Sequence, residues 1–410
     1  MELECLGASG EVGRSAFLLH TDKKIMIDYG IKLFDESGTA KFPVESSDPD
    51  ITILSHAHLD HSGCIPAISR KGRWYATPPT KDICEILWKD SMKIMGEGLP
   101  YDLADYKRAL KRWNPLLYEQ TIRPGETSIT LHDAGHISGA AMVDIEYKGK
   151  RVFYSGDFKA GDTFMHRGAS YYEDVDVLII ETTYANREHP RRSDIDKTLM
   201  DHIYETIDNG GNVLLPSFAV GRTQELIATI RNYNQDIPVF VDGMGREITR
   251  IYLDHPKYIR DAKAFRKAVK NVRMVSSIPD KKAATRNPSI IISSAGMMNG
   301  GPILNYLFHC NAQSKLIFTG YCVEDTNGWL LQNKGYIIKD EEELHVDLPW
   351  EYLDFSAHGG RADLLNFIKH ANPEKIILVH GDDTQGFANE LIENFGYDAV
   401  APKAGEKIEV

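Results

Sequence analysis

The sequence has few cysteines and no long hydrophobic run. Five cysteines, at positions 5, 64, 84, 310 and 322, form no CxxC pair, which disfavours a disulfide framework or a thiolate zinc site. No stretch approaches the roughly 20 apolar residues of a membrane span, and the amino terminus carries acids where a signal peptide needs basic residues. We therefore expect a cytoplasmic protein, in a reducing compartment and off the membrane, whose cysteines are small buried side chains.

Basic residues are also in deficit. The 47 Lys and Arg residues against 59 Asp and Glu give a formal charge of −12, which alone argues against a nucleic-acid-binding protein. The charge is segregated, however: residues 246–286 hold twelve basic and four acidic residues, a local net of 12 − 4 = +8. Such a strip is the expected footprint for nucleic-acid phosphates, although part of it is an ordinary solvated helix face.

The chain has 410 residues, 42% of them hydrophobic, which predicts two or three globular domains. Runs such as KKIMIDYG, ITILSHAH, VFYSGD and VDVLIIET indicate buried strands that end in polar clusters, and residues 80–113 have helical spacing. From about residue 186 a second α/β layer with a mostly parallel sheet is predicted. The first pattern returns after about residue 350, so we expect one domain from 1–185 and 351–410 and an insertion at 186–350.

The strongest chemical signal is HAHLDH, directly after the predicted strand ITILS. Side chains two apart on extended backbone project to the same side, so His56 and His58 can share one metal ion. Asp60 and His61 follow as the chain turns and can face a second ion. Imidazole and carboxylate suit zinc, and four such side chains in six positions favour a metal site over a polar turn that happens to hold histidines.

Two metal ions need more ligands than this motif supplies. His136 lies in a glycine-flanked turn, and Asp157 and His380 each lie at the end of a predicted strand. An α/β sheet places its ligands at such strand ends. Each residue alone is a weak candidate, but together they complete two coordination shells.

In order, Asp28 after a strand, HAHLDH, His136, Asp157 and His380 resemble the motifs of the metallo-β-lactamase fold. The insertion, with PSFAVGRTQE and SSAGMMNGGP, resembles the β-CASP branch of that fold, whose members are nucleases. The resemblance spans essentially the whole chain. It implies an α/β fold, a metallo-β-lactamase αββα sandwich with an inserted β-CASP α/β domain. It also implies an acid, Glu181 in IETTY, and a histidine, His358 in FSAHGG.

Within this branch the chain resembles the archaeal cleavage-and-polyadenylation-specificity-factor type more than RNase J. Histidine at position 380 matches the RNA-directed members, whereas DNA-repair members tend to carry an aliphatic residue there. The ETTY context of Glu181 points the same way. The implied function is a zinc-dependent ribonuclease of RNA processing or decay. It would act on single-stranded RNA as an endonuclease, a 5′-to-3′ exonuclease, or both.

The resemblance also implies roles for these residues. A hydroxide activated by two metal ions attacks phosphorus and leaves a 5′ phosphate and a 3′ hydroxyl. His358 is the implied general acid, Glu181 keeps it protonated, and Asp60 belongs with the catalytic residues. The expected ligands of two zinc ions per chain are His56, His58 and His136 for one, Asp60, His61 and His380 for the other, and Asp157 between them.

Three further residues have two interpretations each. Asp28 either orients a ligand or is a strand-end turn residue. Ser217 and Arg222 either contact phosphate or serve packing and a salt bridge. The final segment PKAGEKIEV forms either an edge strand that joins two subunits or an internal strand, and a homodimer or an RNA-processing complex is the expected assembly.

Two other functions stay open at this point. A metal-dependent hydrolase of small esters or lactones accounts for HAHLDH but leaves the insertion, Glu181 and His358 without a purpose. A non-catalytic RNA-processing scaffold is disfavoured by the intact ligand set. The remaining histidines, including His132, are expected to be structural or at the surface.

Overall fold

The computed structural model describes residues 1–33, 39–70 and 72–410, which form two compact units. Unit 1 consists of Met1–Asp162, Gly168–Glu188 and His358–Val410, and unit 2 of Thr163–Arg167 and His189–Ala357. The middle of the chain is thus an insertion. The long segment of unit 2 runs from 189 to 357, beside the expected 186 and 350, and it extends past 350 because β19 (Trp350–Tyr352) still pairs with another strand of this unit, β16 (Lys315–Phe318).

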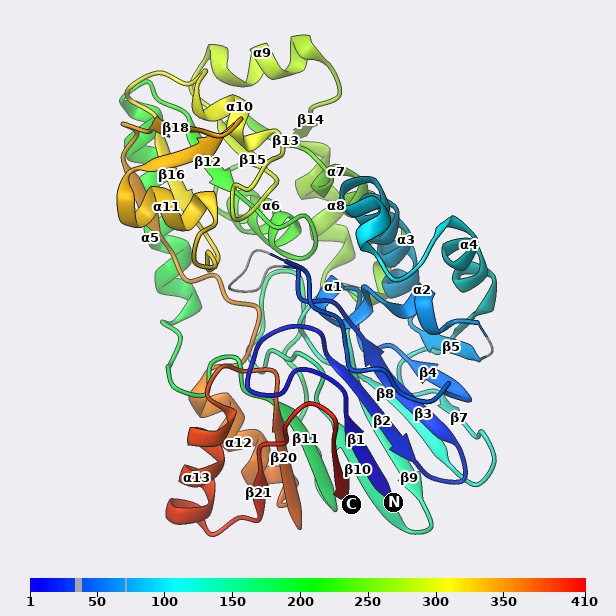
Figure 1. The fold of residues 1–410 in the computed structure, drawn as a ribbon. Coiled ribbons are helices and arrows are strands. Elements are labelled where there is room, and N and C mark those ends of the chain that lie inside the picture. The colour runs from blue at the N-terminus through cyan, green and yellow to red at the C-terminus, as the bar shows by residue number, and fades with distance from the viewer. Residues whose placement is uncertain (34–38, 71) are drawn as a thin grey trace. The chain divides into compact units, whose positions relative to one another are not determined.

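Unit 1 contains two seven-stranded sheets (Figure 1). The first has the order β22-β1-β2-β3-β4-β5-β6, with β1 (Glu2–Cys5), β2 (Ala16–His20), β3 (Lys24–Tyr29), β4 (Ile51–Ile53), β5 (Arg73–Ala76), β6 (Trp113–Pro115) and β22 (Glu406–Glu409). The second has the order β21-β20-β11-β10-β9-β8-β7, with β7 (Thr121–Ile122), β8 (Ser128–Asp133), β9 (Ala141–Tyr147), β10 (Lys150–Tyr154), β11 (Val177–Glu181), β20 (Lys375–Val379) and β21 (Ala399–Val400). The carboxyl-terminal strand β22 pairs antiparallel with β1 of its own chain.

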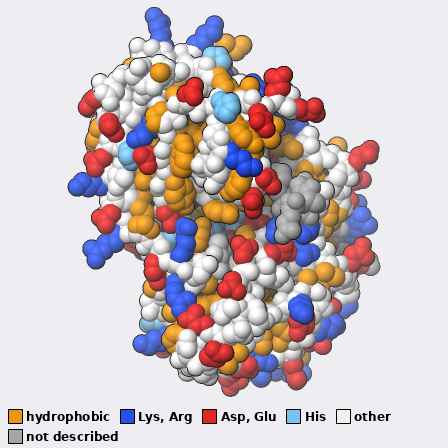
Figure 2. Space-filling view, turned by 60° about the vertical axis from the view of Figure 1, so that its left-hand side comes forward, with side chains coloured by type: hydrophobic (Ala, Val, Ile, Leu, Met, Phe, Trp, Pro, Cys, Tyr) orange, Lys and Arg blue, Asp and Glu red, His pale blue; other side chains and the backbone are white. Residues whose placement is uncertain are grey.

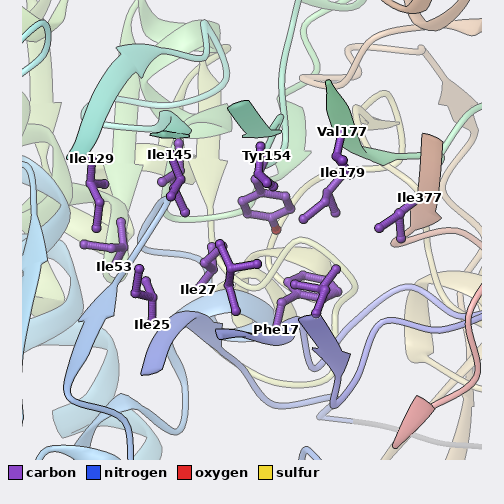
Figure 3. Packing of buried hydrophobic residues seen from close by; sticks show 14 of the residues in the cluster. Phe17, Ile25, Ile27, Ile53, Ile129, Ile145, Tyr154, Val177, Ile179 and Ile377 are labelled. Carbon is purple, nitrogen blue, oxygen red and sulfur yellow. The ribbon is translucent and has the colours of Figure 1, made fainter. Parts of the chain in front are cut away.

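The core of unit 1 lies between these sheets (Figure 3). Phe17, Ile25 and Ile27 point from the first sheet toward Ile145 and Tyr154 of the second, and all of these side chains are almost fully buried. Alternate residues of each strand supply the facing surfaces, as period-2 patterning requires. The two sheets are therefore the inner layers of a sandwich.

Helices form the outer layers of unit 1. On the side of the first sheet lie α1 (Leu59–Ser62), α2 (Ile65–Ile68), α3 (Pro78–Met95), a 3₁₀ turn (Gly96–Gly98) and α4 (Leu103–Arg112); beside β20 and β21 lie α12 (Arg361–Ala371) and α13 (Thr384–Phe395) (Figure 1). The helical spacing over 80–113 thus corresponds to two helices, because Gly96 has φ +53° and ends α3. This is the αββα arrangement that the resemblance to the metallo-β-lactamase fold implied.

Unit 2 has a six-stranded sheet whose paired strands are all parallel, in the order β14-β13-β15-β12-β16-β19. Besides β16 and β19 it contains β12 (Val213–Pro216), β13 (Val239–Asp242), β14 (Val272–Met274) and β15 (Ile290–Ser293), and a separate hairpin of β17 (Tyr336–Lys339) and β18 (Glu342–His345). Its helices are α5 (Arg192–Asp208), α6 (Arg222–Tyr233), α7 (Gly245–Asp254), a 3₁₀ turn (Pro256–Tyr258), α8 (Ala262–Lys270), α9 (Ile278–Arg286), α10 (Ile303–Leu307) and α11 (Asn327–Lys334). The basic segment 246–286 corresponds to α7–α9.

Large apolar side chains reach the surface of unit 2, and Figure 2 shows several orange strips on the face that carries α5, α11 and β16. The exposed ones in this unit include Tyr204, Phe218, Phe308, Tyr321, Ile338, Trp350 and Tyr352. Among the helices of the described ranges, none combines the length and apolar character needed to cross a bilayer.

A buried histidine makes the stability of unit 2 depend on pH. His166 is 5% exposed, and its ring lies 6.1 Å from that of Tyr252. Burial lowers its pKa to about 4, against a smaller opposite effect of the Glu225 carboxylate. Since the pKa is lower in the folded than in the unfolded chain, the neutral ring stabilises the fold fully above about pH 6.5. This contribution is lost as the pH falls toward 4.

We therefore expect His166→Gln to weaken the acid sensitivity of unit 2. Between pH 7 and 4.5 the drop in its free energy of unfolding should shrink by about 2–3 kcal/mol, the equivalent of the pKa shift. Urea unfolding at the two pH values measures this. His345→Gln, at an exposed position of β18, is the control and should follow the wild type. An unchanged pH dependence in His166→Gln would assign the acid sensitivity to other groups.

Candidate metal centre

The ends of strands and the loops after them bring the predicted ligands of unit 1 together. Asp28 lies near the end of β3, His56 to His61 follow β4, and Asp157 follows β10. Backbone packing fixes these loops: a Cβ at Gly30 would lie 1.8 Å from the carbonyl oxygen of Asp60, so glycine is needed where β3 meets the HAHLDH loop. The amide of Ser15 also donates to that carbonyl, at 2.7 Å. The loop is held from two sides.

The first group of ligand atoms comes from three histidines and an aspartate. His56 Nε2 lies 3.2 Å from His58 Nδ1 and 3.5 Å from Asp157 Oδ2. His136 Nε2 lies 3.1 Å from His58 Nδ1 and 3.9 Å from Asp157 Oδ2. These four side chains form one group able to hold a metal ion.

The second group shares Asp157. His380 Nε2 lies 3.2 Å from Asp60 Oδ2, and His380 Nδ1 lies 3.4 Å from Asp157 Oδ1. His61 Nε2 lies 3.3 Å from Asp157 Oδ1 and 3.9 Å from Asp60 Oδ2. The structure thus brings together the side chains that we assigned to each of the two metal ions, and their role as ligands stays a prediction.

Both groups fit a tetrahedral zinc ion. Nitrogen and oxygen ligands at 2.0–2.1 Å from such an ion lie about 3.3 Å from one another, close to the separations seen here. Asp157 turns Oδ2 to the first group and Oδ1 to the second. The buried Oδ1 makes no hydrogen bond of good geometry within the described part of the chain, and its nearest neighbours are imidazole nitrogens of His61 and His380, at 3.3 and 3.4 Å. A buried carboxylate oxygen without a well-aligned donor is costly, and a cation between the side chains would satisfy it.

Asp28 orients one of these side chains. Its Oδ2 lies 2.7 Å from His61 Nδ1, which leaves Nε2 of His61 for the second group. The carboxylate also accepts hydrogen bonds from the amide and hydroxyl of Ser55, both at 2.7 Å, and from the hydroxyl of Tyr154 at 3.0 Å. Such a support fixes the tautomer and direction of a metal-binding histidine.

Ser55 and Tyr154 were missed by the sequence analysis, although each lies close to a predicted ligand. Ser55 directly precedes His56, and Tyr154 ends the strand that leads to Asp157. Their position beside the ligands was a signal, but the sequence alone does not show that both reach Asp28. Ser55 does so because β4 pairs with β3, and Tyr154 does so from β10 of the other sheet.

The electrostatics of the centre favour cations. Burial lowers the pKa of His56 well below its usual value, and the neighbouring His61 adds to this, so His56 is neutral and its lone pair is available. Burial also lowers the pKa of His61, but Asp157, Asp60 and Asp28 together raise it well above the usual value. Burial raises the pKa of Asp157, but His380 and His61 outweigh it and hold this carboxyl ionised. A cation that replaces the proton of His61 would serve the same carboxylates.

Glu181 and His358 form a pair beside Asp157. His358 Nδ1 lies 3.1 and 3.0 Å from the two oxygens of Glu181, and 4.0 Å from Asp157 Oδ2. Glu181 is fixed by the amide of Phe158 at 2.9 Å and by the hydroxyl of Thr183 at 2.6 Å. Because Nδ1 faces Glu181, Nε2 is the ring nitrogen turned away from it.

The surroundings of His358 keep its imidazole protonated. Burial lowers its pKa, but Glu181 and Asp157 outweigh burial and raise it to about 9. The side chain is 20% exposed, so a proton can pass between it and a substrate. Lys159 donates to the carbonyl of His358 at 2.9 Å. Lys159 was not singled out in the sequence because nothing local distinguishes it, and Thr183 entered only as part of the ETTY context of Glu181.

Ser217 and Arg222 lie in unit 2, outside the two ligand groups. Ser217 is buried, and its hydroxyl lies 3.1 Å from that of Thr223. His132 also lies outside both groups: its Nδ1 is 2.8 Å from Glu119 Oε1 and its Nε2 is 3.4 Å from Asp144 Oδ2. His132 thus has the structural surroundings expected for it.

Three family models match the chain. The Beta-lactamase superfamily domain matches residues 23–206, the Beta-Casp domain residues 223–331, and the Zn-dependent metallo-hydrolase RNA specificity domain residues 344–402. A solved structure of a protein of unknown function from Enterococcus faecalis matches with a TM-score of 0.65 and 16% identity, over 99% of both chains. At that identity the match shows the fold alone.

Curated relatives match over nearly the full length. "Probable RNase MJ4" of Methanocaldococcus jannaschii is 37% identical over 100% of both chains. "RNase aCSPSF2" of Saccharolobus solfataricus is 31% identical over 99% of this chain and 85% of its own, and "Transcription termination factor FttA" of M. jannaschii is 32% identical over 99% and 71%. The chain therefore belongs to the β-CASP family of metallo-β-lactamase-fold metallo-hydrolases, together with archaeal cleavage-factor-like RNases.

Proposed function

We propose that the protein is a zinc-dependent ribonuclease that hydrolyses phosphodiester bonds of single-stranded RNA. The observation that carries this is the Glu181–His358 pair, which places a protonated imidazole 4.0 Å from the carboxylate shared by the two ligand groups. A phosphodiester needs such a proton donor for its departing alkoxide. The names of the relatives that match over nearly the full length, and the match to the RNA specificity domain, support the same substrate.

The two ligand groups would hold the metal ions, with Asp157 between them. When bound, two such cations lower the pKa of a water molecule toward about 7 and offset the charge of the phosphate oxygens. Asp28 keeps His61 in the required tautomer, and Thr183 holds Glu181 in place. The chain thus fixes both the ligands and the proton donor before a substrate arrives.

The reaction forms a bond from the oxygen of water to phosphorus and breaks the bond from phosphorus to the 3′ oxygen. His358 donates a proton to that 3′ oxygen, and Glu181 stabilises the imidazolium until then. The products are a 5′ phosphate and a 3′ hydroxyl. Asp60 faces the same space through its contact with His380, and we assign it to the metal ligands and to the catalytic residues.

RNA incubation with zinc-loaded and metal-free protein tests this proposal. We expect cleavage of 5′-labelled single-stranded RNA by the zinc-loaded protein, none after chelation, and recovery when zinc is restored to about two ions per chain. Internal fragments would show endonuclease action, and labelled mononucleotides 5′-to-3′ exonuclease action.

Two results would contradict the proposal. Hydrolysis of a lactone or ester panel without RNA cleavage would favour a small-ester hydrolase. Fewer than one bound zinc per chain, with RNA binding but no cleavage, would favour a non-catalytic RNA-processing scaffold.

A further inference from the structure

An exposed phenylalanine lies at the carboxyl edge of the unit 2 sheet. Phe218 is 37% exposed and comes two residues after β12. β12 is flanked by β15 and β16, so the loops that follow these three parallel strands meet at one edge. In open α/β sheets this edge is where ligands bind.

The position of Phe218 is fixed by hydrogen bonds on its backbone. Its carbonyl oxygen accepts from the hydroxyl of Thr223 at 2.8 Å, from the amide of Thr223 at 3.2 Å and from the hydroxyl of Ser217 at 3.2 Å. These hydrogen bonds fix the backbone from which the partly exposed ring extends. A rigid aromatic side chain binds a flat partner at a low cost in conformational entropy.

Two glycines make room for this ring. A Cβ at Gly296 would lie 2.9 Å from the Phe218 amide nitrogen and 3.1 Å from ring atom Cδ2, and a Cβ at Gly320 would lie 3.0 Å from ring atom Cε2. Neither glycine has φ in the left-handed range, so torsion does not require glycine at these positions. Glycine is needed at both positions because their backbone lies so close to Phe218. Part of the ring thus packs on backbone from two loops while the rest stays open to solvent.

A cation and a buried hydroxyl adjoin the ring. The same Cβ at Gly320 would lie 3.3 Å from Arg222 Nη1, so the guanidinium and the ring meet at this glycine. Thr319, directly before Gly320, is 1% exposed, and its Oγ1 has no hydrogen-bond partner within the described ranges. Buried hydroxyls normally have a partner, which a polar ligand or a water molecule would supply here. Tyr321, directly after Gly320, is 59% exposed.

We propose that Phe218 is a stacking platform for one base of single-stranded RNA and that Arg222 beside it contacts the adjoining phosphate. A partly exposed aromatic ring beside a cation is a combination that binds single strands with little sequence preference, because every base has a π-face that can stack. A single exposed apolar residue needs no functional explanation. Phe218 differs because its backbone is hydrogen-bonded, two glycines leave space for its ring, and a guanidinium lies next to it. The inference rests on the ribonuclease activity proposed above and adds a base contact to it.

Replacement of Phe218 by leucine tests the stacking while it keeps an apolar side chain. With zinc-loaded protein and a labelled RNA oligomer, we expect Phe218→Leu to raise KM about 5- to 50-fold, the usual loss for one stacked base, and to change kcat less than about 3-fold. Phe218→Trp should restore KM, and its fluorescence should be quenched by RNA. The inhibition constant of a base-free ribose-phosphate oligomer should be equal in wild type and Phe218→Leu, because that competitor offers no base.

Phe308→Leu is the matched control. Phe308 belongs to the same unit and is 44% exposed, but it lies after α10 and faces Lys339 of β17, 5.7 Å from its ring. This variant should keep the wild-type KM. A thermal unfolding curve confirms that both leucine variants are folded.

Several outcomes would overturn the base contact. An unchanged KM for RNA in Phe218→Leu would do so. An equal weakening of the binding of RNA and of the base-free oligomer would also do so, because it would indicate that the substitution disturbs the binding surface in general. If wild-type protein does not cleave RNA at all, the ribonuclease proposal fails by itself. The Kd of the uncleaved RNA oligomer is then measured by fluorescence anisotropy for the wild type and for the variants. A higher Kd in Phe218→Leu but not in Phe308→Leu would support the base contact.

Discussion

Asp157→Asn is expected to abolish RNA cleavage, with kcat/KM lowered about 10⁴-fold. Asp157 offers one oxygen to each ligand group, since Oδ2 lies 3.5 Å from His56 Nε2 and Oδ1 lies 3.3 Å from His61 Nε2. Asparagine has one neutral oxygen and a donor in place of the second, so it cannot serve both groups. Loss of the metal ions removes several kcal/mol of transition-state stabilisation, which at 1.36 kcal/mol per tenfold gives this magnitude.

Measuring the zinc content of Asp157→Asn shows whether its activity is lost because the metal ions are lost or because the protein unfolds. We expect bound zinc to fall from about two ions per chain to one or fewer, while the unfolding transition stays cooperative. Asp144→Asn is the control, since Asp144 is also a largely buried acid of unit 1 with a histidine neighbour, His132, but belongs to neither ligand group. It should keep both its zinc and its activity. Full activity of Asp157→Asn with two bound zinc ions would show that another group joins the two sites.

The sequence indicated which side chains gather in the two candidate ligand groups better than it indicated the side chains that support them. HAHLDH follows a short strand, and alternation along extended backbone explains why His56 and His58 face one space. His136 and Asp157 follow β8 and β10 in the same way. Such residues can be found because the chemistry is local: a hydrophobic run ends and a ligand follows.

Pairing between distant strands could not be read from the sequence. His380 reaches the centre because β20 pairs in parallel with β11, with Val379 opposite Glu181. The contact of Tyr154 with Asp28 depends on the packing of one sheet against the other, whereas Thr183 reaches Glu181 from two residues along the chain. A resemblance to known motifs pointed to His380 and Glu181, whereas the supporting role of Tyr154 became visible only in the folded chain.

In the helices, too, some features follow from local sequence signals and others only from the conformation of the folded chain. In α6 (Arg222–Tyr233) the apolar spacing is a local signal, and the observed helix follows that spacing from end to end. The segment 80–113 reads as one amphipathic stretch, but Gly96 ends α3 and Asp102 caps a new helix, α4. The side chain of Asp102 accepts from the amides of Ala104 and Asp105. These turn residues were present in the sequence, and only their conformation decides that the chain breaks there.

His358→Asn is expected to lower kcat for RNA by about 10²- to 10⁴-fold, the usual contribution of a general acid, and to leave the zinc content unchanged. The 3′ oxygen of RNA is a poor leaving group and needs the proton that His358 holds beside Glu181. A p-nitrophenyl phosphodiester has a leaving group acidic enough to depart without one. On that substrate the same variant should therefore lose less than about tenfold.

Glu181→Gln supplies the complementary test through pH. Burial lowers the pKa of His358, but the Glu181 carboxylate is the largest influence that raises it. Its removal should lower that pKa and move the alkaline limb of the RNA-cleavage profile to lower pH, because the donor must be protonated to act. The p-nitrophenyl substrate should show no matching shift. Equal losses on both substrates in His358→Asn, with an unmoved alkaline limb in Glu181→Gln, would mean that the pair positions the substrate and donates no proton.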